Sequence, residues 1–335
     1  MRLFPFLFAL LLFLRMGGNA YAQKGEGMSL TFVEYNCENL FDCSHDSLKN
    51  DYDFLPEGNM HWMRSRYWKK LNDIGRVVQQ CGGSGKEWRL PDLVALVEVE
   101  NDSTIQMLTR VSMLAGAGYR YVMTRSEDER GVDVALLYNP FTFRTLNHYP
   151  LRITPPKGYR HTRDILYVCG QQRNGDTLHV FVVHAPSRRG GKKATEDYRL
   201  AVAGRLTDAV DSLRRTTETP SIVIAGDFND YTGDKALRAL CARQLVDVTE
   251  NAVGLNDRNI TGTYKYQGRW DSLDHIFLSE PLARNLLRSF VYDAPWLLQD
   301  DARGGKKPRR TYLGTAYNGG VSDHLPLVIG IGMED

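Results

Sequence analysis

Carboxylate, amide and imidazole side chains recur at the ends of apolar segments in this sequence. Glu98 lies within the apolar run 93–99, and His184 closes the run 178–184. A charge flanked by buried strand residues is costly unless it is paired or binds a metal ion. The repetition of this pattern therefore indicates that several strand ends converge on one site. Its further members are Asn36, Glu38, Asp227, Asn229, Asp274, Asp323 and His324.

The types of these residues favour the hydrolysis of a phosphate ester. Glu, Asp and Asn supply hard oxygen ligands, which suit Mg²⁺, Mn²⁺ or Ca²⁺. The chain has no Cys-x-x-Cys and no His-x-x-x-His pair, which argues against a structural zinc site. A bound divalent cation polarises a phosphoryl oxygen and stabilises the leaving oxygen. A carboxylate can orient or deprotonate water, and an imidazole can stabilise charge in the transition state.

A mixed set of strands and helices must position these residues. Residues 30–37 alternate apolar and polar side chains, which predicts a strand. Residues 61–80 and 199–213 have apolar side chains at three- and four-residue spacings, which predicts two amphipathic helices. Strands and helices do not alternate strictly, so we expect a layered α/β or α+β sandwich rather than a Rossmann sheet. Further strands are predicted over 93–99, 132–138, 165–169, 178–184, 221–225, 272–278 and 325–331.

Residues 1–22 have the composition of a secretory signal peptide. Arg2 precedes residues 3–14, which are mostly Leu, Phe and Ala, and residues 20–22 (AYA) form a small-x-small cleavage site. This apolar run is shorter than the roughly 20 residues that span a bilayer. We therefore expect an exported protein, periplasmic or extracellular, with no stable membrane span and a single domain over residues 28–335.

The overall composition excludes two classes of protein. The chain of 335 residues has a formal net charge of +2, which falls to 0 without residues 1–22, because these contain Arg2 and Arg15 and no acidic residue. A histone-like, globally basic binder of nucleic acid is therefore excluded. Hydrophobic residues make up 42% of the chain and aromatic residues 10%, which excludes a disordered chain.

The five cysteines do not have the spacing of a small disulfide scaffold. Their number is odd, and no pairing follows from the sequence. We expect buried or incidental free thiols, of which two could form one disulfide bond. They are Cys37, Cys43, Cys81, Cys169 and Cys241.

Seven short segments carry the candidate residues and their neighbours. They are YNCENLFD (35–42), ALVEVEN (95–101), RGVDVALLYNP (130–140), VVHAPSRRGG (182–191), GDFND (226–230), LDHIFLS (273–279) and SDHLPL (322–327). In this order and at these spacings they resemble the endonuclease/exonuclease/phosphatase family, the deoxyribonuclease I-like superfamily. The resemblance spans roughly residues 29–332. It implies a four-layer sandwich, two mixed β-sheets face to face with helices outside, and a site at one end of the sheets.

The resemblance also implies a site for a divalent cation, with Mg²⁺ or Mn²⁺ expected and Ca²⁺ compatible. Glu98 matches the main metal-ligand glutamate of the family, although Val97 replaces the glutamine of the family's Leu-Gln-Glu motif. Asn36 matches the site asparagine. Glu38 matches a position where some members have a second metal-linked carboxylate, and Asp323 matches a metal-site carboxylate.

Five further residues match catalytic positions of the family. Asp227 matches the residue that orients the attacking water, and Asn229 matches the amide that holds this water or the phosphate. His324 matches the imidazole that binds the scissile phosphate. Asp274 matches the carboxylate that orients this histidine. His184 lies where nuclease-type members have a histidine that faces the phosphate or the leaving group.

Basic residues near these motifs are candidates for substrate binding. Arg163 matches a phosphate-contacting arginine in similar family members. Arg188 and Arg189 follow the His184 segment, and residues 306–310 form a second basic stretch. Either these are solvated loops, or they form a positive rim that steers a polyanion towards a neutral protein.

The family covers nucleases, inositol phosphate phosphatases, sphingomyelinases and abasic-site repair enzymes. Residues 272–275 read SLDH rather than the Trp-Cys-Asp-Arg of inositol polyphosphate phosphatases, and residues 184–187 read HAPS rather than the Tyr-Val-Pro-Asn of repair enzymes. HAPS is similar to the secreted deoxyribonucleases. We therefore expect a secreted, metal-dependent phosphodiesterase, an endonuclease on nucleic acid, acting as a monomer. The alternatives are a phosphatase or phospholipase-type phosphoesterase of the same fold and, less favoured, a non-catalytic binding protein.

Overall fold

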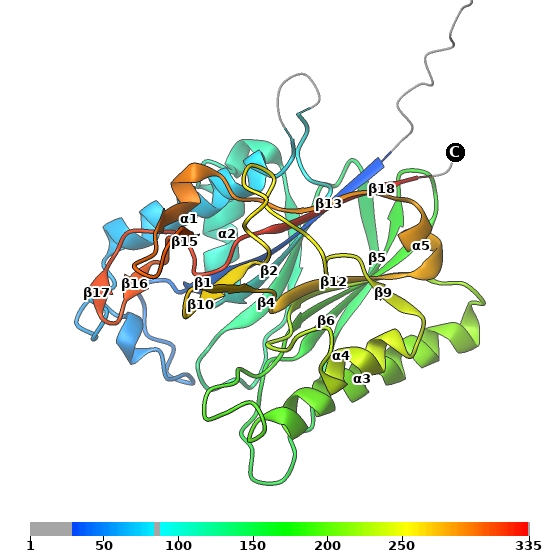
Figure 1. The fold of residues 1–335 in the computed structure, drawn as a ribbon, viewed down its shortest axis with the longest axis horizontal. Coiled ribbons are helices and arrows are strands. Elements are labelled where there is room, and N and C mark those ends of the chain that lie inside the picture. The colour runs from blue at the N-terminus through cyan, green and yellow to red at the C-terminus, as the bar shows by residue number, and fades with distance from the viewer. Residues whose placement is uncertain (1–28, 84–87, 334–335) are drawn as a thin grey trace, which may run out of the picture.

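Two six-stranded mixed sheets form the centre of the molecule (Figure 1). The computed structural model describes residues 29–83 and 88–333, so the expected signal peptide lies outside the described residues. The first sheet has the strand order β13-β18-β1-β2-β4-β3. Its strands are β1 (Ser29–Leu40), β2 (Leu93–Val99), β3 (Arg120–Met123), β4 (Asp133–Tyr138), β13 (Leu286–Val291) and β18 (Leu327–Gly332).

The second sheet packs face to face against the first, and β7 lies against β2 and β4. Its strand order is β5-β6-β7-β8-β12-β9. Its strands are β5 (Phe143–Leu151), β6 (Ile165–Gln172), β7 (Thr177–His184), β8 (Ser221–Asp227), β9 (Leu245–Asp247) and β12 (Asp274–Ser279).

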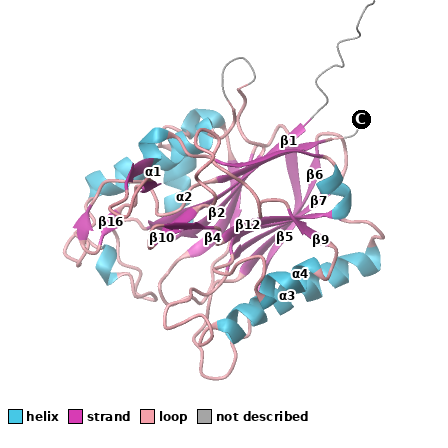
Figure 2. Ribbon diagram, in the orientation of Figure 1, coloured by secondary structure: helices cyan, strands magenta, loops and turns pink. Residues whose placement is uncertain are grey.

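Helices cover the outer faces of both sheets, which gives four layers (Figure 2). The helices α1 (Arg64–Gln80) and α2 (Asp102–Arg110) lie on the first sheet, and α3 (Glu196–Thr216) and α4 (Lys235–Cys241) lie on the second. A short helix, α5 (Glu280–Arg284), follows β12. The predicted four-layer sandwich of mixed sheets is thus confirmed. No helix of the described chain has the length and hydropathy to cross a membrane.

Short elements surround one end of the sheets. Three small hairpins lie there: β10 (Tyr264–Tyr266) with β11 (Arg269–Asp271), β14 (Leu298–Asp300) with β15 (Lys306–Pro308), and β16 (Tyr312–Leu313) with β17 (Ala316–Tyr317). Single 3₁₀ turns occur at Tyr52–Phe54, Ala115–Ala117 and Pro295–Leu297.

The apolar periodicity of the sequence explains the packing. In α1 the buried residues Tyr67, Leu71, Ile74 and Val78 recur every three or four positions and face the first sheet. Strand β2 is buried on both faces, since it lies between the other sheet and the helices, and it therefore reads as a nearly continuous apolar run. Each fully buried Leu, Ile or Val contributes roughly 1.5–3 kcal/mol through the hydrophobic effect.

Strand direction brings distant polar residues to one edge. Strands β1 and β2 run parallel, as do β7 and β8, so the carboxyl ends of each pair lie together. Strand β12 runs antiparallel to β8 and begins where β8 ends. The register pairs Asp227 with His184 on one side and with Asp274 on the other. These three polar residues therefore lie in one row across the sheet.

All five cysteines are free thiols in the structure. Cys37 and Cys81 are buried, and burial raises the pKa of each thiol. The expectation of buried or incidental thiols agrees with this arrangement.

A buried ion pair lies in the second sheet. The ring of His275 donates from Nδ1 to Asp247 Oδ2 over 2.8 Å and from Nε2 to the backbone oxygen of Asp230 over 3.0 Å. Both partners are acceptors, so the ring is protonated. Burial opposes this charge, but Asp247 raises the pKa of His275 above 6.5. The same contact holds the pKa of Asp247 below 3.8 in spite of burial.

His275→Gln is expected to cost about 3–5 kcal/mol of unfolding free energy, because it leaves the buried Asp247 charge without its partner. The raised pKa of His275 makes its contribution complete below its unfolded pKa and lets it decline as pH rises through the folded pKa. The effect should thus be larger at about pH 5.5 than at about pH 8.5 in urea unfolding. His148→Gln, at an exposed position, is the control. Equal effects at both pH values would contradict the assigned charge.

Candidate active site

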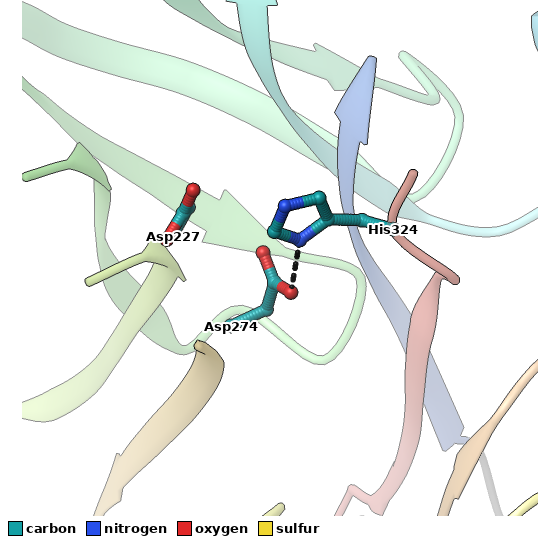
Figure 3. A group of neighbouring side chains, drawn as sticks. All are labelled: Asp227, Asp274 and His324. Carbon is teal, nitrogen blue, oxygen red and sulfur yellow. Dashed lines mark hydrogen bonds and ion pairs between the residues drawn. The ribbon is translucent and has the colours of Figure 1, made fainter. Parts of the chain in front are cut away.

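The strand ends place three acidic or basic side chains in direct proximity (Figure 3). Asp227 comes from the end of β8, Asp274 from the start of β12, and His324 from the segment before β18. One ligand-type atom of each lies within 4.8 Å of the others, and all three residues are buried. These segments are far apart in the sequence, so only the sandwich brings them together.

His324 and Asp274 form a buried ion pair. His324 Nδ1 donates to Asp274 Oδ2 over 2.6 Å, and the hydroxyl of Thr263 donates to the same oxygen. Burial opposes a charge on His324, but the adjacent Asp274 raises the pKa of the imidazole well above 6.5. The ring is therefore protonated, and its Nε2–H is available to a phosphate oxygen. The hydroxyl of Ser322 fixes the backbone by accepting from the His324 amide over 3.0 Å.

Asp227 is held in a tight turn at the end of β8. Its Oδ1 accepts from the Asn229 amide over 2.8 Å, and its Oδ2 accepts from Asn36 Nδ2 over 3.1 Å. Gly226 makes the turn possible: its φ is +147°, and a Cβ there would lie 1.8 Å from the backbone oxygen of Val183. Burial and the nearby Asp274 raise the pKa of Asp227 to about 7. A carboxylate of this pKa can take a proton from water near neutral pH.

Glu98 is presented by a local irregularity of β1 and β2. Its φ is +61°, and Glu38 and Asn39 on β1 have φ of +46° and +59°. From the pair Asn36–Val97 to the pair Leu40–Val99, β1 advances by more residues than β2, so the register shifts at this point. Non-glycine residues with positive φ are strained and cluster at functional sites. The Asn39 amide donates to Glu98 Oε2 over 2.8 Å and fixes this carboxylate.

His184 lies between two of these carboxylates as a neutral ring. Its Nε2 is 3.6 Å from Glu98 Oε1 and 3.8 Å from Asp227 Oδ2, beyond the range of strong hydrogen bonds. Burial, with the charges of Arg163 and Arg130, holds the pKa of His184 well below 6.5. At this site His184 is therefore a neutral ring, whereas His324 is a positively charged hydrogen-bond donor.

Glu38 and Asp323 share one arginine. Arg310 contacts Glu38 Oε1 through Nε at 3.2 Å and donates from a terminal nitrogen to Asp323 Oδ2 over 2.7 Å. The Thr311 amide donates to the second oxygen of Glu38 over 2.6 Å. Burial and the nearby Asp323 raise the pKa of Glu38 to about 7. Lys70 from α1 donates to the backbone oxygen of Glu38 and to Thr311 Oγ1.

Three carboxylates of the type that suits a hard divalent cation come from the ends of β1 and β2 and from the segment before β18, namely Glu38, Glu98 and Asp323. Glu38 and Asp323 both contact Arg310, and burial together with the charge of Asp323 raises the pKa of Glu38 to about 7. The group of Asp227, Asp274 and His324 fits a cation less well, because a protonated imidazole cannot bind a metal. We therefore assign that group to the substrate.

The three candidate arginines are held in different ways. Arg163 is buried, and its guanidinium contacts Asp128 Oδ2 at 3.1 Å and the Ala185 oxygen at 2.9 Å. Asn229 Nδ2 donates to the same Ala185 oxygen over 3.1 Å, so Arg163 supports the segment after His184. Its contact with a substrate stays a prediction.

Arg188 is joined to the loop after β8. It donates from Nε to the Asn229 oxygen over 2.6 Å, pairs with Asp234 at 2.9 Å and lies 3.9 Å above the ring of Tyr231. Arg189 is exposed. Contacts of both arginines with a substrate stay predictions.

Several residues at the site were not singled out from the sequence. Lys70 could have been found from the sequence, because a lysine on the apolar face of a helix is unusual and indicates a specific buried contact. Glu34 could have been found in a similar way, since it faces the same side of β1 as Asn36; its two carboxylate oxygens have no hydrogen-bond partner among the described residues. Arg130, which lies 3.6 Å from Glu98, comes from a loop and carried no periodic signal. Arg310 belongs to the basic stretch 306–310, which the sequence offered as part of a rim, and its contact with Asp323 was not predicted.

The family model described as "Endonuclease/Exonuclease/phosphatase family" matches residues 31–333. The chain belongs to this family. Members of the endonuclease/exonuclease/phosphatase family are metal-dependent phosphoester hydrolases, and this protein is accordingly an enzyme of that class. A search of curated proteins found no match.

Solved structures of this family have the same fold at low sequence identity. A family member from Bacteroides thetaiotaomicron is 18% identical, with a TM-score of 0.60 over 92% of this chain and 100% of that one. The mannosyl-6-phosphatase Bt3783 of the same organism is 19% identical, with a TM-score of 0.58 over 90% and 98%. The catalytic domain of human Nocturnin with bound sulfate is 15% identical, with a TM-score of 0.53 over 90% and 93%.

The chemistry of the family can be assigned to groups of this chain. A divalent cation would be held by carboxylates among Glu98, Asp323 and Glu38, and it would supply Lewis acidity at a phosphoryl oxygen. In that chemistry His324, paired with Asp274, would donate its Nε2–H to a phosphoryl oxygen, and Asp227 would accept the proton of the attacking water. The amide of Asn229 and the neutral ring of His184 would supply further polar contacts beside it.

Proposed function

We propose that the protein is an exported phosphoesterase that uses Mg²⁺ or Mn²⁺ to hydrolyse a compact phosphate ester. The juxtaposition of Asp227 with the His324–Asp274 pair carries the proposal, because it provides a base and a charged donor within a few ångströms. Export is proposed from the leader sequence. Its test is the amino-terminal sequence of protein recovered from periplasm or medium after expression of the full chain; the mature chain should begin at Gln23.

The basic residues of the expected rim form ion pairs, which favours a compact substrate over a polyanion. The expected rim for a polyanion is largely neutralised by adjacent acids, which lowers the attraction of a long nucleic acid. The mannosyl-6-phosphatase among the similar structures also supports a compact phosphate ester as the substrate. The pairs are Arg188–Asp234, Lys192–Asp234, Lys306–Asp300 and Lys307–Asp301.

An endonuclease is the second candidate. Arg189 and Lys193 are exposed and have no ion pair in the described part of the chain. Tyr266 on the hairpin β10–β11 is 58% exposed and offers a stacking surface for a base. These features favour a single-stranded or flexible nucleic acid.

The mature protein with Mg²⁺ or Mn²⁺ is expected to hydrolyse p-nitrophenyl phosphate or bis-p-nitrophenyl phosphate, and EDTA should abolish this activity. Sugar phosphates, plasmid DNA, RNA, phosphoinositides and sphingomyelin are then compared by kcat/KM. A preference for compact esters supports the first candidate, and a preference for DNA or RNA supports the second. Absence of metal-dependent turnover with every ester would refute the proposed enzyme activity.

A further inference from the structure

A cavity of about 380 Å³ lies beside the catalytic residues. Arg130, whose guanidinium is 3.6 Å from Glu98, forms one wall, and Pro186, which follows His184 and Ala185 in the chain, forms another. Tyr159 and Tyr198 also line the cavity. Arg130 therefore joins the cavity wall to Glu98, and Pro186 joins it to the end of β7.

The size of the cavity restricts its occupant. Pockets for small molecules have volumes of about 300–1,000 Å³, so this one is at the lower end. It accommodates one six-membered ring with its substituents and not a nucleic-acid duplex.

The cavity has charged walls but no unpaired charge. Each basic side chain in its wall lies close to a carboxylate. A second anionic group on the substrate would find no free cation here, and it would approach the carboxylates. The pairs are Arg130–Glu98 (3.6 Å), Arg160–Glu129 (2.7 Å), His161–Glu127 (3.2 Å) and Arg163–Asp128 (3.1 Å).

Hydroxyl groups match such a wall. A hydroxyl both donates and accepts, so neighbouring hydroxyls can contact a guanidinium and its carboxylate at the same time. The hydroxyl-bearing side chains of Ser187 and Thr195 add further donors and acceptors. Charged partners make these hydrogen bonds stronger than neutral ones.

The aromatic residues fit a sugar ring better than a nucleobase. The rings of Tyr159 and Tyr198 have centroids 5.0 Å apart and are tilted by 54° against each other. They are therefore in contact and leave no parallel slot into which a flat base could stack. The exposed part of Tyr159 instead offers apolar surface to the C–H face of a sugar.

We propose that this cavity binds the neutral, hydroxyl-rich part of the substrate and that the enzyme acts on phosphorylated monosaccharides. This inference rests on the proposed phosphoesterase function. The cavity then selects the alcohol, while Asp227, His324 and the metal-site carboxylates act on the phosphate.

The test compares esters that share a primary alkyl phosphate and differ in the alcohol. The kcat/KM is measured for glucose, mannose and galactose 6-phosphates, for glycerol 3-phosphate, and for nucleoside 5′-monophosphates. At least one hexose phosphate is expected to exceed glycerol 3-phosphate by about tenfold or more, since ring contacts are lost in glycerol. Tyr159→Ala and Arg160→Ala should bring this ratio towards one, chiefly by raising KM for the hexose phosphate.

Matched variants separate selection from folding. Tyr159→Phe keeps the ring and loses only the hydroxyl bond to Ala194, so it should retain the preference. Arg284→Ala removes an arginine that is 77% exposed and ion-paired, like Arg160 at 79%, but distant from the cavity; its ratio should equal that of the wild type. Unchanged melting temperatures exclude misfolding.

The outcomes distinguish the two proposals. Metal-dependent hydrolysis of glycerol 3-phosphate or p-nitrophenyl phosphate without a hexose preference would refute the sugar site and leave the phosphoesterase in place. A preference for nucleoside 5′-monophosphates that Tyr159→Ala removes would assign the cavity to a nucleoside and also refute it. No hydrolysis of any ester would overturn both proposals.

Discussion

His324→Ala is expected to lower kcat/KM for bis-p-nitrophenyl phosphate by about 10³–10⁴-fold, a loss of roughly 4–6 kcal/mol of transition-state stabilisation. The imidazolium is held by Asp274 through a 2.6 Å hydrogen bond and is buried, so its charge acts on the phosphate with little screening by water. The measurement is kcat/KM at saturating Mg²⁺, together with the melting temperature.

Asp274→Asn removes the negative charge beside His324 and keeps a hydrogen-bond acceptor that can orient the ring. The amide oxygen can still accept from His324 Nδ1, but it no longer stabilises the imidazolium, so the pKa of His324 should fall. Activity that requires the protonated ring should then be lost at a lower pH than in the wild type. His148→Ala, at an exposed position on β5, is the control for loss of a histidine. Near-normal kcat/KM in His324→Ala would refute the assigned role.

Glu98→Gln is expected to have the second-largest effect, a loss of about 10²–10³-fold in activity at limiting metal. Glu98 contributes a negative oxygen to the proposed cation site, and an amide is a weaker ligand for a hard cation. The concentration of Mg²⁺ for half-maximal activity should rise by at least about tenfold, and excess metal should restore part of the rate.

Two measurements keep this prediction specific. Glu127→Gln changes an exposed glutamate outside the proposed metal site and should leave the metal requirement unchanged. Isothermal titration of Mn²⁺ into the metal-free protein reports binding without turnover. If Glu98→Gln lost activity while its Mn²⁺ affinity stayed at the wild-type level, Glu98 would not be a metal ligand.

The elements that place the site could be predicted from local sequence patterns. Strand β2 and helix α1 have the continuous and periodic apolar patterns that burial requires, and both lie where the sequence predicted them. Asp227 and His324 were identifiable because each adjoins an apolar strand and lies in a family motif. A local sequence pattern was thus sufficient to find a residue when a polar side chain directly adjoins a buried apolar strand.

Other features depend on tertiary contacts that no local pattern encodes. Arg310 lies in a basic stretch that resembles a solvated loop, yet its guanidinium joins Glu38 to Asp323. The pairing of Arg188 with Asp234 spans 46 positions of the chain. The cavity beside the site is likewise built mainly from loops, with Tyr198 from the first turn of α3, so its charge compensation is visible only in the folded chain.

The left-handed backbone positions have a consequence for how such a protein can adapt to heat. Glu38, Glu98 and Asn229 adopt a conformation that glycine reaches at lower cost. Glycine there would relieve strain, but it would remove the ligand or the amide that the position presents. At this end of the sandwich, selection for thermal tolerance and selection for turnover therefore act in opposite directions. Heat-adapted relatives should accordingly gain their stability in other parts of the fold.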